Sequence, residues 1–249
     1  MEIEWRIGSD DVKRVKTLIR KQADNALVRA RTAKNLAATK PRVKRHEFWF
    51  QMAAMRLTSV QRSGPDGHVA RFIRTKPFPL AYRTIRNRRD AESFIATAIR
   101  KAGGICFPGR IVEHLAANLE RLENGEWPRS LQQSDRLTQP ASRAVEKEVA
   151  GYIQATFDGF GPKQSRNPLK ALGLIRFEIP ISSRVTGWLN EFGFPVRLSA
   201  AALADRKYYE FVSSGIQALC EECGVFPCVL DAAIFASIDG DGWTITNVH

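Results

Sequence analysis

The chain has 249 residues, of which 44% are hydrophobic and 26% are charged, so a disordered or fibrous chain is excluded. Lysine and arginine number 38 against 26 acidic residues, and the net charge is +12. This surplus favours a nucleic acid as the partner, because each phosphate that a cation neutralises releases condensed counterions, although charge alone leaves a membrane surface or an inert basic surface open.

The first expected element is a basic N-terminal helical arm, residues 1–45. Ser9 is expected as its N-cap, because Asp10 and Asp11 follow it in the first turn and apolar residues then recur at helical spacing. The first fifty residues contain 13 lysines and arginines against 6 acids. We therefore expect this arm to be an addition to the main domain, residues 46–249.

The main domain is predicted to be helical throughout. Apolar periodicity and cap residues predict helices over residues 47–63, 91–102, 111–124, 141–157, 205–223 and 227–238. The segment 126–140 is expected to be the least ordered, since it is polar and contains Pro128 and Pro140. No segment shows the alternation of a strand, so the predicted fold class is all-α.

The segment from Phe157 to Asn167 is the most informative motif. A helix ends, Gly159-Phe-Gly161 forms a turn, and Pro162 opens a new helix at its favoured first position. Such a turn leaves the backbone N–H groups of a helix N-terminus free to bind one phosphate of DNA. We expect both glycines to allow positive φ and a close approach of the DNA backbone. Without further context, a tight connection between two helices is the simpler interpretation.

The run from Gly159 to Pro195 resembles the helix-hairpin-helix DNA glycosylase superfamily, which includes endonuclease III and the 8-oxoguanine DNA glycosylases. Residues 55–65 resemble the helix end whose loop probes the gap left by the extruded base, and residues 227–233 resemble the helix that closes the fold. The resemblance covers residues 45–240. It implies two helical lobes with the hairpin beside a DNA-binding cleft.

The resemblance implies that Lys163 is the catalytic residue, because the second hairpin helix begins with a lysine in members that also cleave abasic sites. A lysine with a lowered pKa can attack the sugar C1′ and form a Schiff base. The alternative is a lysine that only contacts phosphate. The DNA-binding residues expected from the resemblance are Gln61, Arg62, Gly64, Gly159, Gly161, Lys163, Ser165 and Arg166.

Position 182 departs from the family pattern, which has an aspartate nineteen residues after the lysine. This chain has Ser182, which can cap a helix but cannot stabilise positive charge on the sugar. Three explanations remain open: a natural variant in which another carboxylate assists, a binding protein that has lost excision, or an engineered form. The assisting carboxylate would be Asp231 or Asp158.

Three of the four cysteines cluster at Cys220, Cys223 and Cys228. A metal site needs four good ligands, and only the distant Cys106 offers a fourth sulfur. We therefore interpret them as small hydrophobic residues and expect neither a metal nor a cofactor. No apolar run reaches the roughly 20 residues that span a bilayer, and the N-terminus lacks a signal-peptide pattern. We expect a protein of the cytoplasm or nucleoid.

The function that these features predict is base excision from double-stranded DNA, with or without cleavage of the abasic strand, by a monomer without a cofactor. The alternative is a catalytically impaired DNA-binding protein that recognises lesions or modified bases, which Ser182 supports. A third class, a structural protein that binds RNA or a membrane, explains the charge but does not explain the hairpin.

Overall fold

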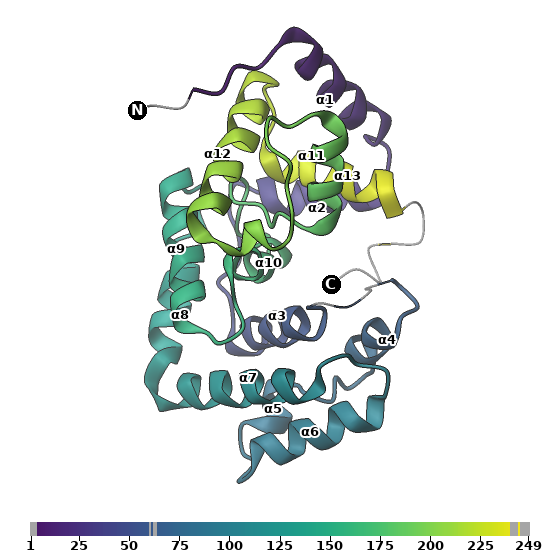
Figure 1. Cartoon of the computed structure of the whole chain (residues 1–249). Coiled ribbons are helices and arrows are strands. Elements are labelled where there is room, and N and C mark those ends of the chain that lie inside the picture. The colour runs from purple at the N-terminus through teal and green to yellow at the C-terminus, as the bar shows by residue number, and fades with distance from the viewer. Residues whose placement is uncertain (1–3, 60, 62–63, 240–243, 245–249) are drawn as a thin grey trace.

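A computed structural model describes residues 4–59, 61, 64–239 and 244, and every regular element in this part of the chain is a helix. The predicted all-α fold is therefore confirmed. The ribbon has an upper and a lower lobe (Figure 1). Each lobe is organised around its own cluster of buried apolar side chains.

The lower lobe comprises residues 43–175. Its helices are α3 (Arg45–Leu57), α4 (His68–Arg74), α5 (Tyr82–Ile85), α6 (Ala91–Ala102), α7 (Pro108–Arg121), the π-helical turn η1 (Leu122–Glu126), α8 (Trp127–Asp135), α9 (Arg143–Thr156) and α10 (Pro162–Ala171). Helix α3 packs against α5, α7 and α10, and the buried Trp49 on it donates its indole N–H to the Leu80 carbonyl at 2.8 Å. Helix α3 therefore organises the core of this lobe.

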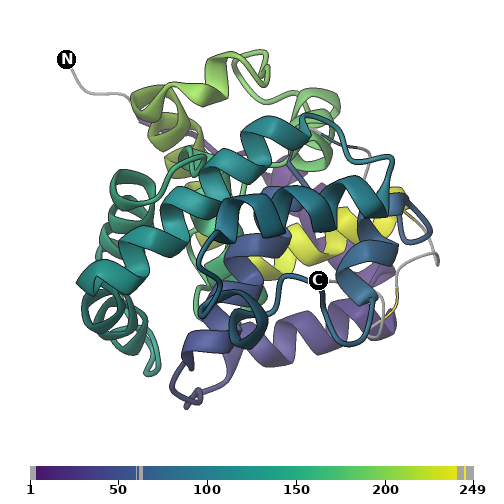
Figure 2. The same ribbon diagram turned by 90° about the horizontal axis from the view of Figure 1, so that it is seen from below.

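The upper lobe joins the two ends of the chain. Its helices are α1 (Ser9–Lys21), α2 (Ala26–Leu36), α11 (Ser183–Phe192), the short 3-10 turn η2 (Ala202–Ala204), α12 (Arg206–Glu222) and α13 (Pro227–Asp239). Helices α1 and α2 pack on α13, and Val15 belongs to the same buried cluster as the C-terminal helices. Helices α1 and α2 are therefore not a separate arm, because their apolar side chains are buried in this lobe. In the view from below, the lower-lobe helices lie in front of α13 (Figure 2).

Most helix starts follow local chemistry. The carboxylates of Asp90 and Asp205 cap α6 and α12, each accepting a backbone N–H three residues later at 2.8 Å. Helix α1 has Gly8 at the N-cap, rather than Ser9 as expected. The reason is that Asp11 reaches back and accepts the Gly8 N–H at 3.0 Å.

Two predicted boundaries are wrong. Helix α3 ends at Leu57, well before residue 63, and the hydroxyls of Thr58 and Ser59 both donate to the Met55 carbonyl at this end. The segment expected to be least ordered contains α8. Its proline, Pro128, lies in the first turn, where a missing N–H is tolerated, and the neighbouring Trp127 is buried.

Candidate functional site

A tight turn joins α9 to α10 and contains the two glycines of the hairpin. The chain leaves α9 at Phe157, Gly159 has a φ of +80°, and Gly161 is the N-cap of α10. Helix α7 holds this turn, because the Asn118 side chain accepts the Asp158 N–H at 2.8 Å and donates to the Asp158 carbonyl at 3.0 Å. The chain thus forms the helix, turn and helix that the sequence predicted.

The two hairpin glycines differ in what requires them. A Cβ at Gly159 would lie 2.5 Å from His114 Nδ1 and 2.7 Å from Arg56 Cζ, so both its positive φ and its surroundings exclude a side chain. Gly161 has φ −71° and ψ −173°, and a Cβ there would meet nothing within 4 Å. The expectation of positive φ is therefore wrong for Gly161. Its small size leaves open space at the start of α10.

The first turn of α10 presents backbone donors next to this open space. Pro162 has no N–H, and the first intrahelical bond runs from the Ser165 N–H to the Gly161 carbonyl at 3.0 Å. The N–H groups of Lys163 and Gln164 precede the first acceptor that the helix itself can offer. With the positive end of the helix dipole, they form a suitable contact for one phosphate.

A second loop pair adjoins the first turn of α10, where the Gln164 side-chain amide donates to the Ser59 hydroxyl just after α3. The Gln61 amide oxygen accepts the Cys106 N–H at 3.0 Å, which joins the loop after α3 to the loop before α7. The next residue, Phe107, has a φ of +53° and a side chain that is 63% exposed. Sequence analysis missed Phe107, although a Phe-Pro pair after two glycines signals an unusual helix start. Arg62 lies outside the described residues, and Gly64 faces open space.

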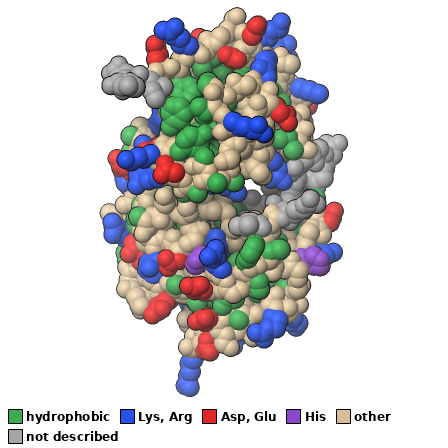
Figure 3. Space-filling view, in the orientation of Figure 1, with side chains coloured by type: hydrophobic (Ala, Val, Ile, Leu, Met, Phe, Trp, Pro, Cys, Tyr) green, Lys and Arg blue, Asp and Glu red, His purple; other side chains and the backbone are tan. Residues whose placement is uncertain are grey.

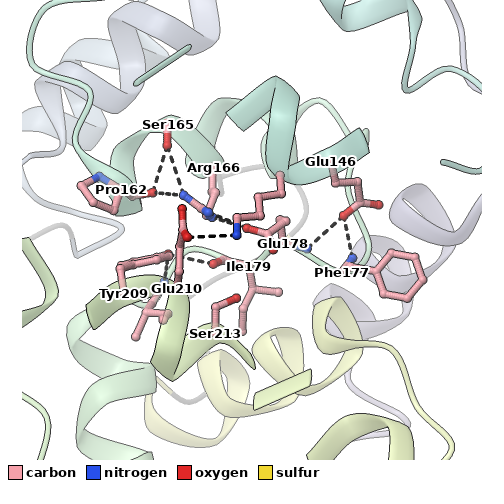
Figure 4. Close-up of polar contacts among 12 residues, drawn as sticks. Glu146, Pro162, Ser165, Arg166, Phe177, Glu178, Ile179, Tyr209, Glu210 and Ser213 are labelled. Carbon is pink, nitrogen blue, oxygen red and sulfur yellow. Dashed lines mark hydrogen bonds and ion pairs between the residues drawn. The ribbon is translucent and has the colours of Figure 1, made fainter. Parts of the chain in front are cut away.

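Two of the expected DNA contacts lie inside the protein. Ser165 is buried and donates to the Pro162 carbonyl at 2.9 Å. Arg166 is 3% exposed, and its Nε and Nη2 lie 2.7 and 2.5 Å from Glu178 Oε2 (Figure 4). Its guanidinium also lies over the ring of Tyr209, 4.6 Å from the centroid. These side chains therefore fix α10 to the interior and do not reach DNA.

The interior network also holds the segment that leads into α11. The buried Glu146 carboxylate accepts the backbone N–H groups of residues 176–178 at 2.8–2.9 Å. Burial raises the pKa of Glu146, and these hydrogen bonds oppose the rise. The Tyr209 hydroxyl accepts the Ile181 N–H and donates to the Ile179 carbonyl, each at 2.9 Å. The path from α10 to α11 is thus fixed by buried polar groups.

Lys163, Ser182 and Asp231 line one pocket of about 120 Å³. They come from α10, the start of α11 and α13, so the pocket lies where the lower lobe meets the upper lobe. The space-filling surface is hollowed between the lobes at this level (Figure 3). The structure thus brings together the three side chains that the sequence nominated for catalysis. We call this space the Lys163 pocket.

Cations surround the amine in the Lys163 pocket. Burial lowers the pKa of Lys163, and the nearby charges of Lys170 and Arg184 lower it further. Arg31 also lines the pocket, and its guanidinium carbon lies 4.2 Å from the centroid of Phe235, which Arg184 approaches to 4.7 Å. A lysine in such surroundings is deprotonated more readily than a lysine in water, as a nucleophile requires.

The carboxylates are placed differently from the family pattern. Ser182 is the N-cap of α11 and accepts the Val185 N–H at 3.4 Å. Asp231 is the only carboxylate among the described residues that line the pocket, and it pairs with Lys170 at 2.8 Å. Asp158 pairs with Arg121 at 3.3 Å and does not line the pocket. Of the two assisting carboxylates considered, only Asp231 is therefore placed near Lys163.

Lys170 is a site residue that sequence analysis missed. It follows Lys163 by seven residues, which is two helical turns, so both side chains lie on the same stripe of α10. Burial lowers the pKa of Lys170, while Asp231 raises it. Helical periodicity is the sequence signal that could have placed these two lysines on the same side of α10.

The clustered cysteines are buried in the apolar core of the upper lobe. Burial raises the pKa of Cys228 to about 12, and it also raises the pKa values of Cys220 and Cys223. Among the described residues, no group of three or more histidine, cysteine or acidic side chains is placed to hold a metal ion. That these thiols hold neither zinc nor an iron–sulfur cluster stays a prediction.

The fold and site define a two-lobed helical protein with a hairpin turn beside an amine-containing pocket. Comparison of the chain with family models, with curated proteins and with solved structures finds no match in any of the three. None of the described helices combines the length and the apolar character needed to cross a bilayer.

Proposed function

We propose that the protein binds duplex DNA with the face that carries the hairpin turn, Gln61 and Phe107, and acts through Lys163 on a nucleotide extruded into the Lys163 pocket. The position of Lys163 carries this proposal. It lies in the first turn of α10, beside the donors that suit a phosphate, and also in a pocket where burial lowers its pKa. Binding of the DNA backbone and the reaction at the sugar would therefore both take place at the first turn of α10.

The chemistry that fits this site is imine formation at the sugar. The nitrogen of neutral Lys163 bonds to the C1′ aldehyde of an abasic site, and both amine hydrogens leave with the aldehyde oxygen as water. With an intact nucleotide, the same nitrogen displaces the base, which departs with the bonding electrons and takes up one of the two amine hydrogens. Burial and neighbouring cations lower the pKa of Lys163, which favours the neutral amine that both reactions need.

Ser182 weakens the second of these reactions. A carboxylate at this position would stabilise the positive charge that develops on the sugar as the base leaves, and a hydroxyl used as a helix cap does not. The site is therefore better suited to imine formation on an abasic site than to rapid release of an intact base. Base excision remains the reaction class that we propose, and release of the intact base is expected to limit its rate.

Borohydride trapping on a duplex with one abasic site tests the proposal, because the reaction needs no base recognition. The parent protein should form a covalent complex, and Lys163→Gln should abolish it while duplex binding persists. Lys207→Gln, which changes an exposed lysine on α12, is the matched control and should trap like the parent. Trapping by Lys163→Gln at the parental level would show that the assignment of the amine is wrong.

A salt titration tests the DNA-binding part separately. Affinity for a duplex should fall with salt, with log K decreasing by about 0.9 per log unit of salt for each neutralised phosphate. Gly161→Ala should weaken binding without unfolding, because its Cβ meets nothing within the protein. Gly187→Ala, an equally unobstructed glycine in α11, is the control. Affinity that stays flat with salt would contradict DNA binding.

The second candidate function is a DNA-binding protein without catalysis, and Ser182 is the observation that favours it. In that case the parent would bind the duplex with strong salt dependence but would not trap, and Ser182→Asp would not restore trapping. The same two experiments therefore separate the enzyme from the binder.

A further inference from the structure

A second and larger cavity adjoins the Lys163 pocket. It has a volume of about 660 Å³ and lies among α2, α3, the C-terminal end of α10, and the end of α4 with the segment that follows it. Arg31, Lys170 and Ala171 line both cavities. Because α10 rises about 1.5 Å per residue, Lys170 lies about 10.5 Å along the helix from Lys163. A ligand that joins the two cavities would therefore extend along α10.

Five cationic side chains line this second cavity, which we call the cationic chamber: Arg31, Lys34, Arg74, Lys76 and Lys170. No acidic side chain lies among the described residues of its lining. Lys34, Arg74 and Lys76 form no ion pair with any carboxylate in the described part of the chain. Two carboxylates act from outside the lining, since Asp231 pairs with Lys170 at 2.8 Å and Glu47 raises the pKa of Lys34. Lys34, Arg74 and Lys76 still repel one another, so an anion among them would be stabilised.

The remaining walls suit a flat ring with hydrogen-bond donors. Phe50 and Phe78 lie on one side with ring centroids 5.3 Å apart. The side-chain oxygens of Asn35 and Gln51, two further lining residues, are buried and accept no hydrogen bond from any described residue. Buried acceptors of this kind are expected to find a donor, and ring N–H or amino groups of a base would supply one.

We propose that the extruded base carries an anionic substituent and that this substituent occupies the cationic chamber. The inference rests on the proposed function and narrows its substrate class to bases with a carboxylate or phosphate arm. A cationic chamber would also stabilise the negative charge of a departing base. The chamber would therefore stabilise negative charge on the leaving base, whereas the carboxylate of the family pattern stabilises positive charge on the sugar.

The first experiment measures binding of the free base 5-carboxyuracil to the whole protein by calorimetry, with thymine as the neutral probe of matched size. We expect 5-carboxyuracil to bind more tightly by about tenfold, which corresponds to about 1.4 kcal/mol. Lys34→Gln with Lys76→Gln should remove this preference. Lys101→Gln, an exposed lysine on α6 that does not line the chamber, is the control and should retain it. Equal binding of the two bases by the parent, or an unchanged preference in the double variant, would overturn the proposal.

The second experiment separates this inference from the proposed function. The double variant should trap on abasic DNA like the parent, because an abasic site has no base to enter the chamber. Trapping without a preference for 5-carboxyuracil would reject the chamber and keep the enzyme. A preference for 5-carboxyuracil without any trapping would keep an anion site and reject the enzyme.

Discussion

Helix α10 carries cationic side chains on two neighbouring stripes, and the two stripes differ in how their charges are paired. On one stripe, Arg166 is buried and fully compensated, because Glu178 binds it through two nitrogens and the Pro162 carbonyl accepts its Nη1–H at 2.7 Å. On the other, Lys163 and Lys170 share the Lys163 pocket with two arginines and a single carboxylate, Asp231.

The comparison distinguishes structural charges from functional charges. A buried charge with a complete set of partners fixes one arrangement of the backbone, and its loss costs stability. Burial, together with neighbouring cations, lowers the pKa values of Lys163 and Lys170, and such surroundings favour a bound anion. We therefore expect changes beside Arg166 to affect folding, and changes beside Lys163 to affect binding and chemistry.

The largest expected effect is on the compensated stripe. Glu178→Gln keeps the size of the side chain but leaves the buried Arg166 charge unpaired, so the free energy of unfolding should fall by about 3–5 kcal/mol. Urea denaturation measures this loss. Glu148→Gln is the control, since the Arg136–Glu148 pair has the same 2.5 Å separation but is largely exposed and should change stability little. Equal losses in the two variants would remove the distinction.

Among changes in the Lys163 pocket, Ser182→Asp should have the largest effect on chemistry. A carboxylate at this place supplies the missing stabilisation of positive charge, so release of an intact base should accelerate by about 10²–10³-fold, whereas trapping on abasic DNA should change little. Ser182→Asn is the control, because it also caps α11 and adds no charge. If Asn accelerates base release as much as Asp, charge is not the missing element.

Phe107 sharpens the comparison on the DNA side, because its exposed ring contributes little to the core. Phe107→Ala should weaken binding to a duplex with an abasic site by about 1–3 kcal/mol, the range for stacking of a base on an aromatic ring. Fluorescence anisotropy measures the change. Phe107→Tyr keeps the ring and should bind like the parent, whereas loss of affinity in both variants would argue against stacking.

The smallest expected effect is a shift of a pH profile. Trapping requires neutral Lys163, so its rate should rise with pH and level off below the ordinary lysine pKa of 10.5. Arg184→Gln removes a cation that lowers this pKa, so the rise should move to higher pH. Arg197→Gln, an exposed arginine outside the pocket, should leave the profile unchanged. A rise that moves to lower pH would contradict the assigned cause.

Local patterns determined most helices, whereas the candidate nucleophile was proposed from a family resemblance. Pro162 starts α10 and Ser182 caps α11 where the sequence places them, because these effects act within one helical turn. Where a signal has two meanings, the sequence was misleading. A proline such as Pro128 is compatible with a loop and also with the first turn of a helix. Here the segment is a helix, which the buried Trp127 anchors.

The membership of the lobes was decided by tertiary structure alone. The basic segment 1–45 has the composition of a separate arm, yet α1 and α2 pack on α13, some two hundred residues later in the chain. Periodicity predicts that a helix has an apolar face, but it does not say which other helix covers that face.

The roles of the charges on α10 show the same division most clearly. At about 100° per residue, Arg166 lies only about 60° around the helix from Lys163, so both lie on one side of the helix, and the resemblance predicts that both contact DNA. Only the fold places Glu178 and Tyr209 against Arg166 and leaves Lys163 in a pocket. A residue's own position determines where its side chain starts, whereas its burial, partners and pKa depend on segments that the chain brings to it from elsewhere.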